Sequence, residues 1–118
     1  SVMSDCDETF LVFQTGPSAG MHFELPSGKP FIVGRGSSSD TKLDDAKMSR
    51  EHCCLTVEWD GAILVRDLGS SGGTFINEGR IDSGTIWKGF EFSAGESTAV
   101  ILSEEEVGAS RDCTSPMA

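Results

Sequence analysis

The segment LTVEWDGAILV, residues 55–65, gives the clearest indication of the fold class. Its apolar residues Leu55, Val57 and Trp59 alternate with polar ones, as in a strand that buries one face. The dipeptide DG that follows predicts a two-residue hairpin turn, and a second apolar run comes directly after it. The segment therefore predicts two antiparallel strands joined by a tight turn.

Short apolar runs recur on both sides of this hairpin, separated by turns rich in Gly, Pro, Asn and Asp. Strands at such spacing are typical of an all-β sandwich or barrel, and no stretch keeps the 3.6-residue apolar period of a helix. The runs are FLVFQ (10–14), MHFEL (21–25), FIVG (31–34), CLTVEW (54–59), AILVRDL (62–68), GTFIN (73–77), TIW (85–87), FEFS (90–93) and AVIL (99–102).

The two ends of the chain differ in composition from its middle. Residues 1–9 and 103–118 are polar, acidic and rich in Ser, which predicts flexible flanks. Residues 10–102 carry the apolar runs and are long enough to bury a core. We therefore expect one β-sandwich domain between two flexible flanks.

Charge and cysteine content limit the class of protein. A net charge of −10 with nine scattered Lys and Arg residues argues against direct binding of nucleic acid. No apolar run approaches the roughly 20 residues of a membrane span, and no signal peptide is predicted. The cysteines at 6, 53, 54 and 113 are expected to be free thiols, although a Cys6–Cys113 bridge stays open. Free thiols favour an intracellular location, nuclear or cytoplasmic.

Two segments fit neither a strand nor a short turn. GRGSSSDTKLDDAKMSREH (34–52) is long and polar, and DLGSSGGTFIN (67–77) places Gly, Ser and Asn between two strands. Long polar loops on a rigid sandwich often carry the function of a domain. A binding or catalytic site is therefore expected in these two segments.

Metal, catalytic and cofactor sites are all disfavoured by the residues of these loops. Because neighbours on a strand face opposite ways, His52, Cys53 and Cys54 do not converge on one ion, and no second ligand pair is present. Cys54 lies on the same side as His52, but a buried core cysteine is commoner than a nucleophile. GRGSSSD lacks both nucleotide-loop patterns. We predict no metal ligands, no catalytic residues and no cofactor, and so no enzyme.

A receptor for a phosphate group fits the loops better. Such a site needs a fixed guanidinium, with hydroxyl and backbone N–H donors for the remaining oxygens. Arg35 follows a strand between two glycines, Ser49 and Arg50 end the long loop, and Ser70 and Ser71 lie in the second segment. Each has an ordinary surface role when taken alone. Together they would form a phosphate site if the loops meet at one end of the sandwich.

The order of three short motifs resembles the forkhead-associated (FHA) domain family. GR follows a strand, SREH comes at 49–52, and DLGSSGGTFIN comes at 67–77, so the resemblance covers about residues 31–80. It implies a β-sandwich of about eleven short strands with ligand loops at one end. It also implies a non-enzymatic module whose partners are proteins that contain phosphothreonine.

The resemblance implies a role for each matched residue. Arg35 would clamp the phosphate, Ser49 would donate its hydroxyl, and Ser71 would lie near the phosphate. Arg50 would add a second cation. His52 would brace the loops by hydrogen bonding, without contacting the ligand.

One position departs from the family pattern. Where the family has Ser-x-Asn-Gly-Thr, this chain has Gly72 in place of the Asn that holds the peptide backbone after the phosphothreonine. One lost hydrogen bond lowers affinity by roughly 2- to 12-fold. The alternative reading is a structural sandwich with a degenerate, phosphate-independent pocket. The binding set is completed by Ser70 and Gly72, and the supporting set by Gly34, Gly73, Thr74 and Asn77.

Threonines in the predicted flanks add one further hypothesis. Thr9 and Thr114 lie in the expected flexible segments, and Ser115-Pro116 suits a proline-directed kinase. A phosphorylated flank would allow one copy to bind the pocket of another. Phosphorylation-dependent self-association is therefore a possible behaviour of the chain.

Overall fold

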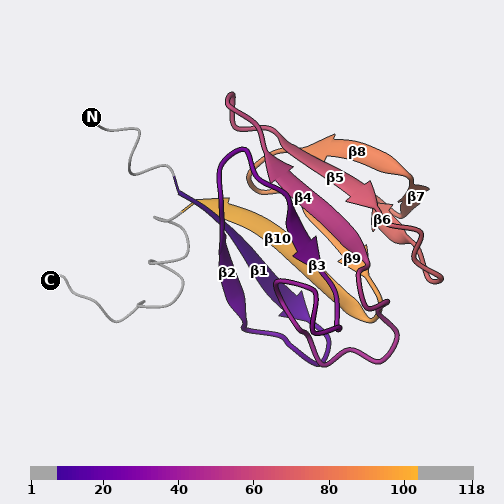
Figure 1. The fold of residues 1–118 in the computed structure, drawn as a ribbon. Helices are drawn as coiled ribbons and strands as arrows, with labels where there is room; N and C mark the ends of the chain where they lie inside the picture. The colour runs from indigo at the N-terminus through magenta and orange to yellow at the C-terminus, as the bar shows by residue number, and fades with distance from the viewer. Residues whose placement is uncertain (1–7, 104–118) are drawn as a thin grey trace, which may run out of the picture.

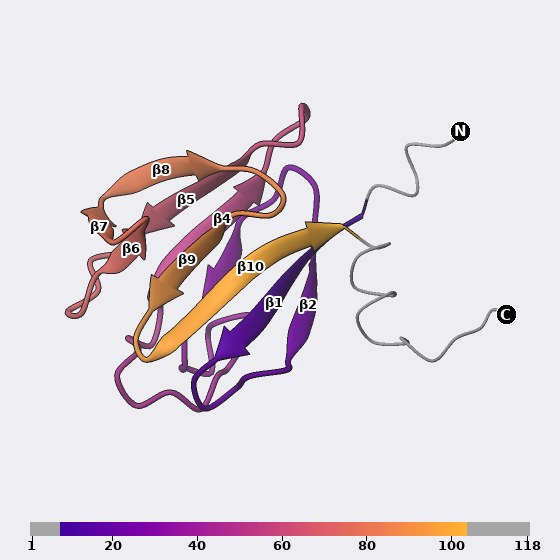
Figure 2. The same cartoon turned by 180° about the vertical axis from the view of Figure 1, so that it is seen from behind.

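Residues 8–103, which the computed structural model describes, form two antiparallel β-sheets packed face to face (Figures 1 and 2). One sheet has the order β2-β1-β10-β9-β6-β7 and the other β3-β4-β5-β8. The strands are β1 (Thr9–Thr15), β2 (His22–Leu25), β3 (Phe31–Val33), β4 (Cys53–Val57), β5 (Ile63–Asp67), β6 (Thr74–Ile76), β7 (Gly79–Ile81), β8 (Ser83–Ile86), β9 (Glu91–Ala94) and β10 (Ser97–Ser103). The all-β sandwich predicted from the sequence is confirmed.

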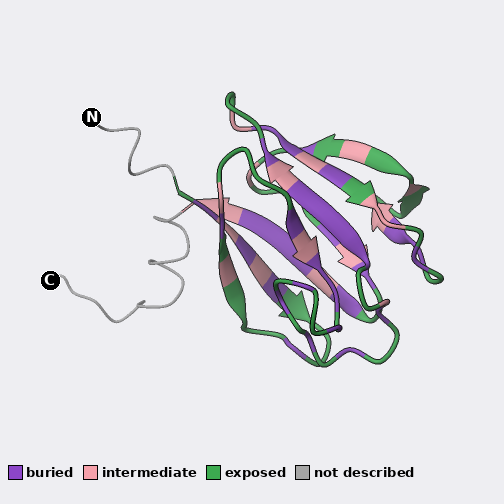
Figure 3. Ribbon diagram, in the orientation of Figure 1, coloured by how far each residue is buried: buried purple, intermediate pink, exposed green. Residues whose placement is uncertain are grey.

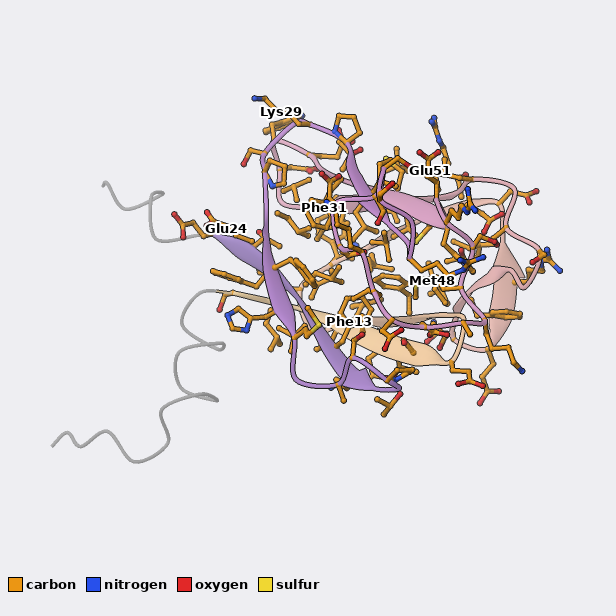
Figure 4. The ribbon with its side chains drawn as sticks, turned by 60° about the horizontal axis from the view of Figure 1, so that its bottom comes forward. Phe13, Glu24, Lys29, Phe31, Met48 and Glu51 are labelled. Atoms are coloured by element: carbon orange, nitrogen blue, oxygen red, sulfur yellow. The ribbon has the colours of Figure 1, made fainter. Side chains whose placement is uncertain are left out.

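The core lies between the sheets and follows the two-residue period of the strands. Leu55 and Val57 of β4 face the interior, as do Ile63 and Val65 of β5. Figure 3 shows that buried residues recur along the strands of both sheets, whereas exposed residues predominate in the loops. Figure 4 shows that aromatic side chains such as Phe13 reach inward between the sheets. The alternating pattern of the sequence therefore reports which face each strand buries.

The described chain has ten strands, one fewer than the eleven or so expected. Each of the nine apolar runs overlaps one strand, and the tenth strand, β7, has no counterpart among these runs. Asn77 and Glu78 have φ angles of 52° and 68° and form a two-residue loop between the paired residues Ile76 and Gly79. This turn needs only two residues, so the polar residues after it are free to continue as a strand.

The hairpin between β4 and β5 is longer at its turn than predicted. Glu58 pairs with Ala62 through an N–H···O bond of 2.7 Å, which leaves Trp59, Asp60 and Gly61 as a three-residue loop. Gly61 has a φ of 92°, as the αL position of such a loop requires. Trp59 is therefore at the turn and 95% exposed, and the expectation that it continues the strand's alternation is wrong.

The sandwich extends one residue beyond each predicted limit. Thr9 pairs with Ser103 and Leu25 and is only 5% exposed, so it is not a threonine of a flexible flank. Thr114, Cys6 and Cys113 lie outside the described residues.

Cys53 and Cys54 are buried free thiols, as expected for these two residues. Residues 8–103 include no helix of a length and apolarity that would cross a membrane.

Candidate functional site

The segments singled out in the sequence meet at one end of the sandwich. β3 and β5 end there, β4 and β6 begin there, and the β9–β10 turn lies at the same end, away from the point where β1 begins and β10 ends (Figure 1). The loop 34–52 and the turn 68–73 therefore lie close to each other. We call these two segments the binding loops.

Arg35 is fixed in place by its own backbone and side chain. Its backbone N–H donates to the carbonyl of Ser49 at 3.2 Å, and its Nε–H donates to the carbonyl of Met48 at 2.7 Å. The side chain is exposed, and no residue in the range 8–103 accepts a hydrogen bond from its two terminal NH₂ groups. The guanidinium is thus held at one nitrogen and keeps two donor groups for a ligand.

The glycine before Arg35 permits a close crossing of two backbone segments. A Cβ atom at Gly34 would lie 1.9 Å from the carbonyl oxygen of Arg50, a distance that no side chain tolerates. The N–H of Gly36 donates to that same carbonyl at 3.1 Å. Gly34 therefore brings Arg35 beside Ser49 and Arg50.

Ser49 connects the two binding loops. Its Oγ accepts a hydrogen bond from the backbone N–H of Ser71 at 3.3 Å, so its own O–H remains a donor. Arg50 is exposed, and its side chain has no partner within residues 8–103. Arg35, the adjacent Ser49 and Arg50, and Ser71 come from three separate stretches of the sequence and are thus brought to one place.

His52 connects the two binding loops from the interior of the protein. It is fully buried, and its Nδ1 accepts a hydrogen bond from the N–H of Ser49 at 3.1 Å. The proton of the neutral ring is therefore on Nε2, which donates to the carbonyl of Gly73 at 2.7 Å. Both ring nitrogens are hydrogen-bonded to the binding loops, so neither is available to accept a proton from a cysteine thiol.

Asp67 organises the turn between β5 and β6. Its Oδ1 accepts from the hydroxyls of Ser70 and Thr74, and its Oδ2 accepts from the N–H groups of Gly69 and Ser70 at 3.0 Å each. Burial alone would raise the pKa of Asp67. The hydrogen bonds from the Ser70 and Thr74 hydroxyls, and then those from the Ser70 and Gly69 N–H groups, lower that pKa below its usual value. The ionised carboxylate is thus an internal anchor of the turn.

Ser70 has a different position from the one expected of a ligand-binding residue. It is 5% exposed, and its hydroxyl donates to Asp67 while accepting from the N–H of Gly73 at 2.9 Å. Its hydroxyl proton is therefore already used inside the protein. We correct its predicted contact with the ligand to a supporting role in the turn.

Gly72 is open to solvent at the point where the two binding loops face each other. A Cβ atom there would meet only the carbonyl oxygen of Lys47, at 3.8 Å, and its φ is not in the left-handed region. Gly73 differs, because its φ is 89° and a Cβ would lie 2.7 Å from Nε of Arg80. The backbone at position 72 therefore has room for the asparagine that the family pattern places there.

The long loop 34–52 is tied to the rest of the protein by residues that the sequence analysis missed. Asp45 is fully buried and accepts from the N–H of Glu96 at 2.8 Å and from the hydroxyl of Ser97 at 2.7 Å. Leu43 and Met48 are 3% and 1% exposed and pack in the core. Asp45 also accepts at Oδ1 from the N–H of Lys47 at 3.0 Å. The local sequence does not reveal its role, because the partners that tie the loop to the sandwich, Glu96 and Ser97, are about fifty residues away.

The binding loops are less acidic than the chain as a whole, because the four Lys and Arg residues of the long loop balance its four carboxylates. Arg35, Lys47 and Arg50 come from the long loop, and Arg80 of β7 donates from Nη2 to the carbonyl of Ser70 at 3.4 Å. Lys47 has a partner in Glu96 at 3.7 Å. Charges beyond about 8 Å are largely screened at physiological salt, so a ligand here experiences these cations more than the distant carboxylates.

The cysteines near this end have no reactive geometry. Burial raises the pKa of Cys53 to about 12, against a lowering by the hydrogen bond with Thr74, so the thiol is protonated at neutral pH. Across residues 8–103, no group of three or more His, Cys, Asp or Glu side chains is arranged to hold a metal ion.

Comparison with known proteins agrees with this architecture. The FHA domain family model matches residues 31–95. The glycogen accumulation regulator GarA of Mycolicibacterium smegmatis is 37% identical over 92 residues, which are 78% of this chain but only 57% of that relative. The chain thus spans little more than half of GarA.

Two solved structures have the same fold. The FHA domain of the CT664 protein of Chlamydia trachomatis has a TM-score of 0.74 at 28% identity, covering 80% of this chain and 96% of that one. An FHA domain studied for its phosphothreonine-dependent interactions has a TM-score of 0.70 at 28% identity, covering 80% and 95%. With the match to the family model and the relative above, these likenesses show that the chain belongs to the forkhead-associated domain family.

Proposed function

We propose that the chain is a phosphothreonine-dependent protein-interaction module that binds a phosphorylated segment of a partner protein at its binding loops. The observation that carries this proposal is the hydrogen bonding of the Arg35 guanidinium. Its guanidinium is fixed through Nε to Met48, while both terminal NH₂ groups are without a partner among residues 8–103. A pre-positioned guanidinium with free donors suits a phosphate better than any neutral ligand.

Each nearby group has a defined part in this proposal. Arg35 binds two phosphate oxygens, and the Ser49 hydroxyl donates to a third oxygen. The Ser71 segment lies near the phosphate, as the family pattern implies, and Arg50 adds a second cation. His52 positions Ser49 through the hydrogen bond to its backbone N–H. Binding then requires little rearrangement, because the donors are already in place.

Gly72 makes the proposed contact with the rest of the peptide weaker than is usual in the family. The phosphate donors do not include residue 72, so their arrangement is independent of this substitution. What is missing is an amide that would hold the peptide backbone. We therefore expect phosphate-dependent binding with a smaller contribution from the residues that follow the phosphothreonine.

The preference for threonine over serine has a calculable lower estimate. Burial of one extra methyl group contributes about 0.8 kcal/mol, or about fourfold in affinity. Any larger preference must come from the shape of the pocket around that methyl group. A phosphoserine peptide is therefore expected to bind measurably but less tightly.

The partner, in this proposal, is a protein that contains phosphothreonine, and the domain itself has no catalytic role. Its location is inside the cell, where protein kinases supply such ligands. Self-association remains a hypothesis for Thr114 only, because Thr9 is buried in β1. Size-exclusion chromatography before and after kinase treatment tests it, and an unchanged monomer peak would exclude it.

A phosphate-independent scaffolding role is the second candidate function, and Gly72 is the feature that favours it. An oriented phosphothreonine peptide library separates the two, with an unphosphorylated library as reference. Arg35→Ala removes the proposed clamp, and Lys29→Ala is the matched control, since it removes an exposed cation of the β2–β3 connection (Figure 4). The proposal expects binding that is lost without phosphate and in Arg35→Ala, but kept in Lys29→Ala. Binding that ignores the phosphate would favour the scaffolding role.

A further inference from the structure

A concave surface lies at the opposite end of the sandwich from the binding loops. It has a volume of about 860 Å³ and is formed by the β4–β5 hairpin, the segment after β2 and the segment after β8. Figure 1 shows these parts near the point where β1 begins and β10 ends. We call it the tryptophan groove; its lining includes Glu24, Pro26, Glu58, Trp59, Asp60 and Trp87.

Both tryptophans of the chain lie in this groove, and both are exposed. Trp59 is 95% exposed at the hairpin turn, and Trp87 is 46% exposed just after β8. The two indoles also line a second hollow of about 320 Å³, together with Glu58 and Asp60. Trp59 contributes almost nothing to the core, so its size and apolar surface are not explained by folding.

The groove has a strong excess of negative charge. Its lining includes Glu8, Glu24, Glu58 and Asp60 but a single cation, Lys88. The salt bridge present within residues 8–103 joins Lys47 and Glu96, which are elsewhere, so no ion pair in this range neutralises Glu24, Glu58 or Asp60. Aromatic faces beside the carboxylates of Glu24, Glu58 and Asp60 are complementary to a cation.

We propose that the tryptophan groove binds a cationic, Arg- or Lys-containing peptide segment of another protein. The guanidinium or ammonium group stacks on the indole faces of Trp59 and Trp87, where cation–π attraction is strongest among the aromatic residues. Glu24, Glu58 and Asp60 neutralise the bound charge. A volume of about 860 Å³ lies within the size range of ligand clefts, roughly 300–1,000 Å³, and accommodates several residues.

Charge disfavours the other candidate occupants of the groove. Residues 1–7 contain two Asp and no Lys or Arg, and residues 104–118 contain three Glu and one Asp against one Arg. The chain's own ends are therefore repelled, as is a second copy with its net charge of −10. Nucleic acids and anionic lipid surfaces are repelled for the same reason. A cationic segment is the occupant that the groove attracts.

The tryptophans supply a direct readout, because the chain has two and both are in the groove. The probe is a capped six-residue peptide with three arginines, and the reference peptides carry three glutamines or three glutamates instead. The arginine peptide is expected to change the tryptophan emission of the 118-residue chain in a saturable way that weakens as salt is raised. The reference peptides are expected to leave the emission unchanged.

Single substitutions then test whether the arginine peptide binds in the tryptophan groove. Trp59→Ala is expected to weaken binding of the arginine peptide by roughly 2- to 30-fold, and Glu58→Gln to weaken it and to reduce its salt dependence. Glu78→Gln removes an exposed carboxylate of the β6–β7 turn and is the matched control, which should bind as the unaltered chain does. Arg35→Ala, which alters the binding loops at the other end of the sandwich, should also leave binding of the arginine peptide unchanged. The proposal is overturned if the arginine peptide does not bind, if the glutamine peptide binds equally well, or if Trp59→Ala and Glu78→Gln bind alike.

Discussion

Replacing Gly72 with asparagine should tighten the binding of a phosphothreonine peptide. One hydrogen bond between neutral groups contributes about 0.5–1.5 kcal/mol, so the expected gain is roughly 2- to 12-fold in Kd. The fold has room for the change, since the nearest atom to a Cβ at this position is the Lys47 carbonyl oxygen at 3.8 Å. The backbone there needs no glycine, because its φ is outside the left-handed region.

Isothermal titration calorimetry with one phosphothreonine peptide measures this gain. Gly72→Ala is the matched control, since it changes the backbone freedom in the same way but adds no amide. In the background of Arg35→Ala the asparagine should give little gain, because the peptide is no longer positioned by its phosphate. If Gly72→Asn and Gly72→Ala bind with the same Kd, the reasoning about position 72 is refuted.

Two further predictions concern the supports of the binding loops. Asp67→Asn removes two of four hydrogen bonds and should lower the free energy of unfolding by about 1–3 kcal/mol at pH 6. Because the pKa of Asp67 is lowered in the folded state, its contribution is complete above the unfolded pKa of about 3.9 and is lost as pH falls through the folded-state pKa. Urea unfolding should therefore show a difference that narrows in acid, and a difference that widens in acid would contradict this. His52→Ala leaves the Ser49 N–H and Gly73 carbonyl without partners and should lower the free energy of unfolding by about 2–5 kcal/mol. A thermal melt of that variant superimposable on the unaltered chain would show that His52 is not a brace.

Local patterns predict most of the fold because the strands bury one face each. Leu55, Val57, Ile63 and Val65 all reach the core from alternate positions, as the sequence indicates. The pattern fails at Trp59, where the turn geometry of Gly61 ends the strand early. An apolar residue at the right spacing is therefore not evidence of burial when a turn lies next to it.

The position of the binding loops could be predicted, but their internal supports could not. Arg35, Ser49 and Ser71 were recognised by order and spacing, which the sandwich converts into proximity. The buried state of Ser70 depends on Asp67, and that of Asp45 depends on Ser97. Such contacts are set by the packed fold, so a polar residue that supports a loop looks the same in sequence as one that faces a ligand.

The binding of phosphothreonine at the loop end of the sandwich can be tested by titrating the ¹⁵N-labelled chain with a phosphothreonine peptide. NMR follows each backbone amide and the Nε–H of Arg35. We predict saturable shifts that are largest at Arg35, Ser49 and Ser71, with none at Trp59 and none with the unphosphorylated peptide. Shifts confined to the sheet faces or to the tryptophan groove, or equal shifts without the phosphate, would contradict the claim.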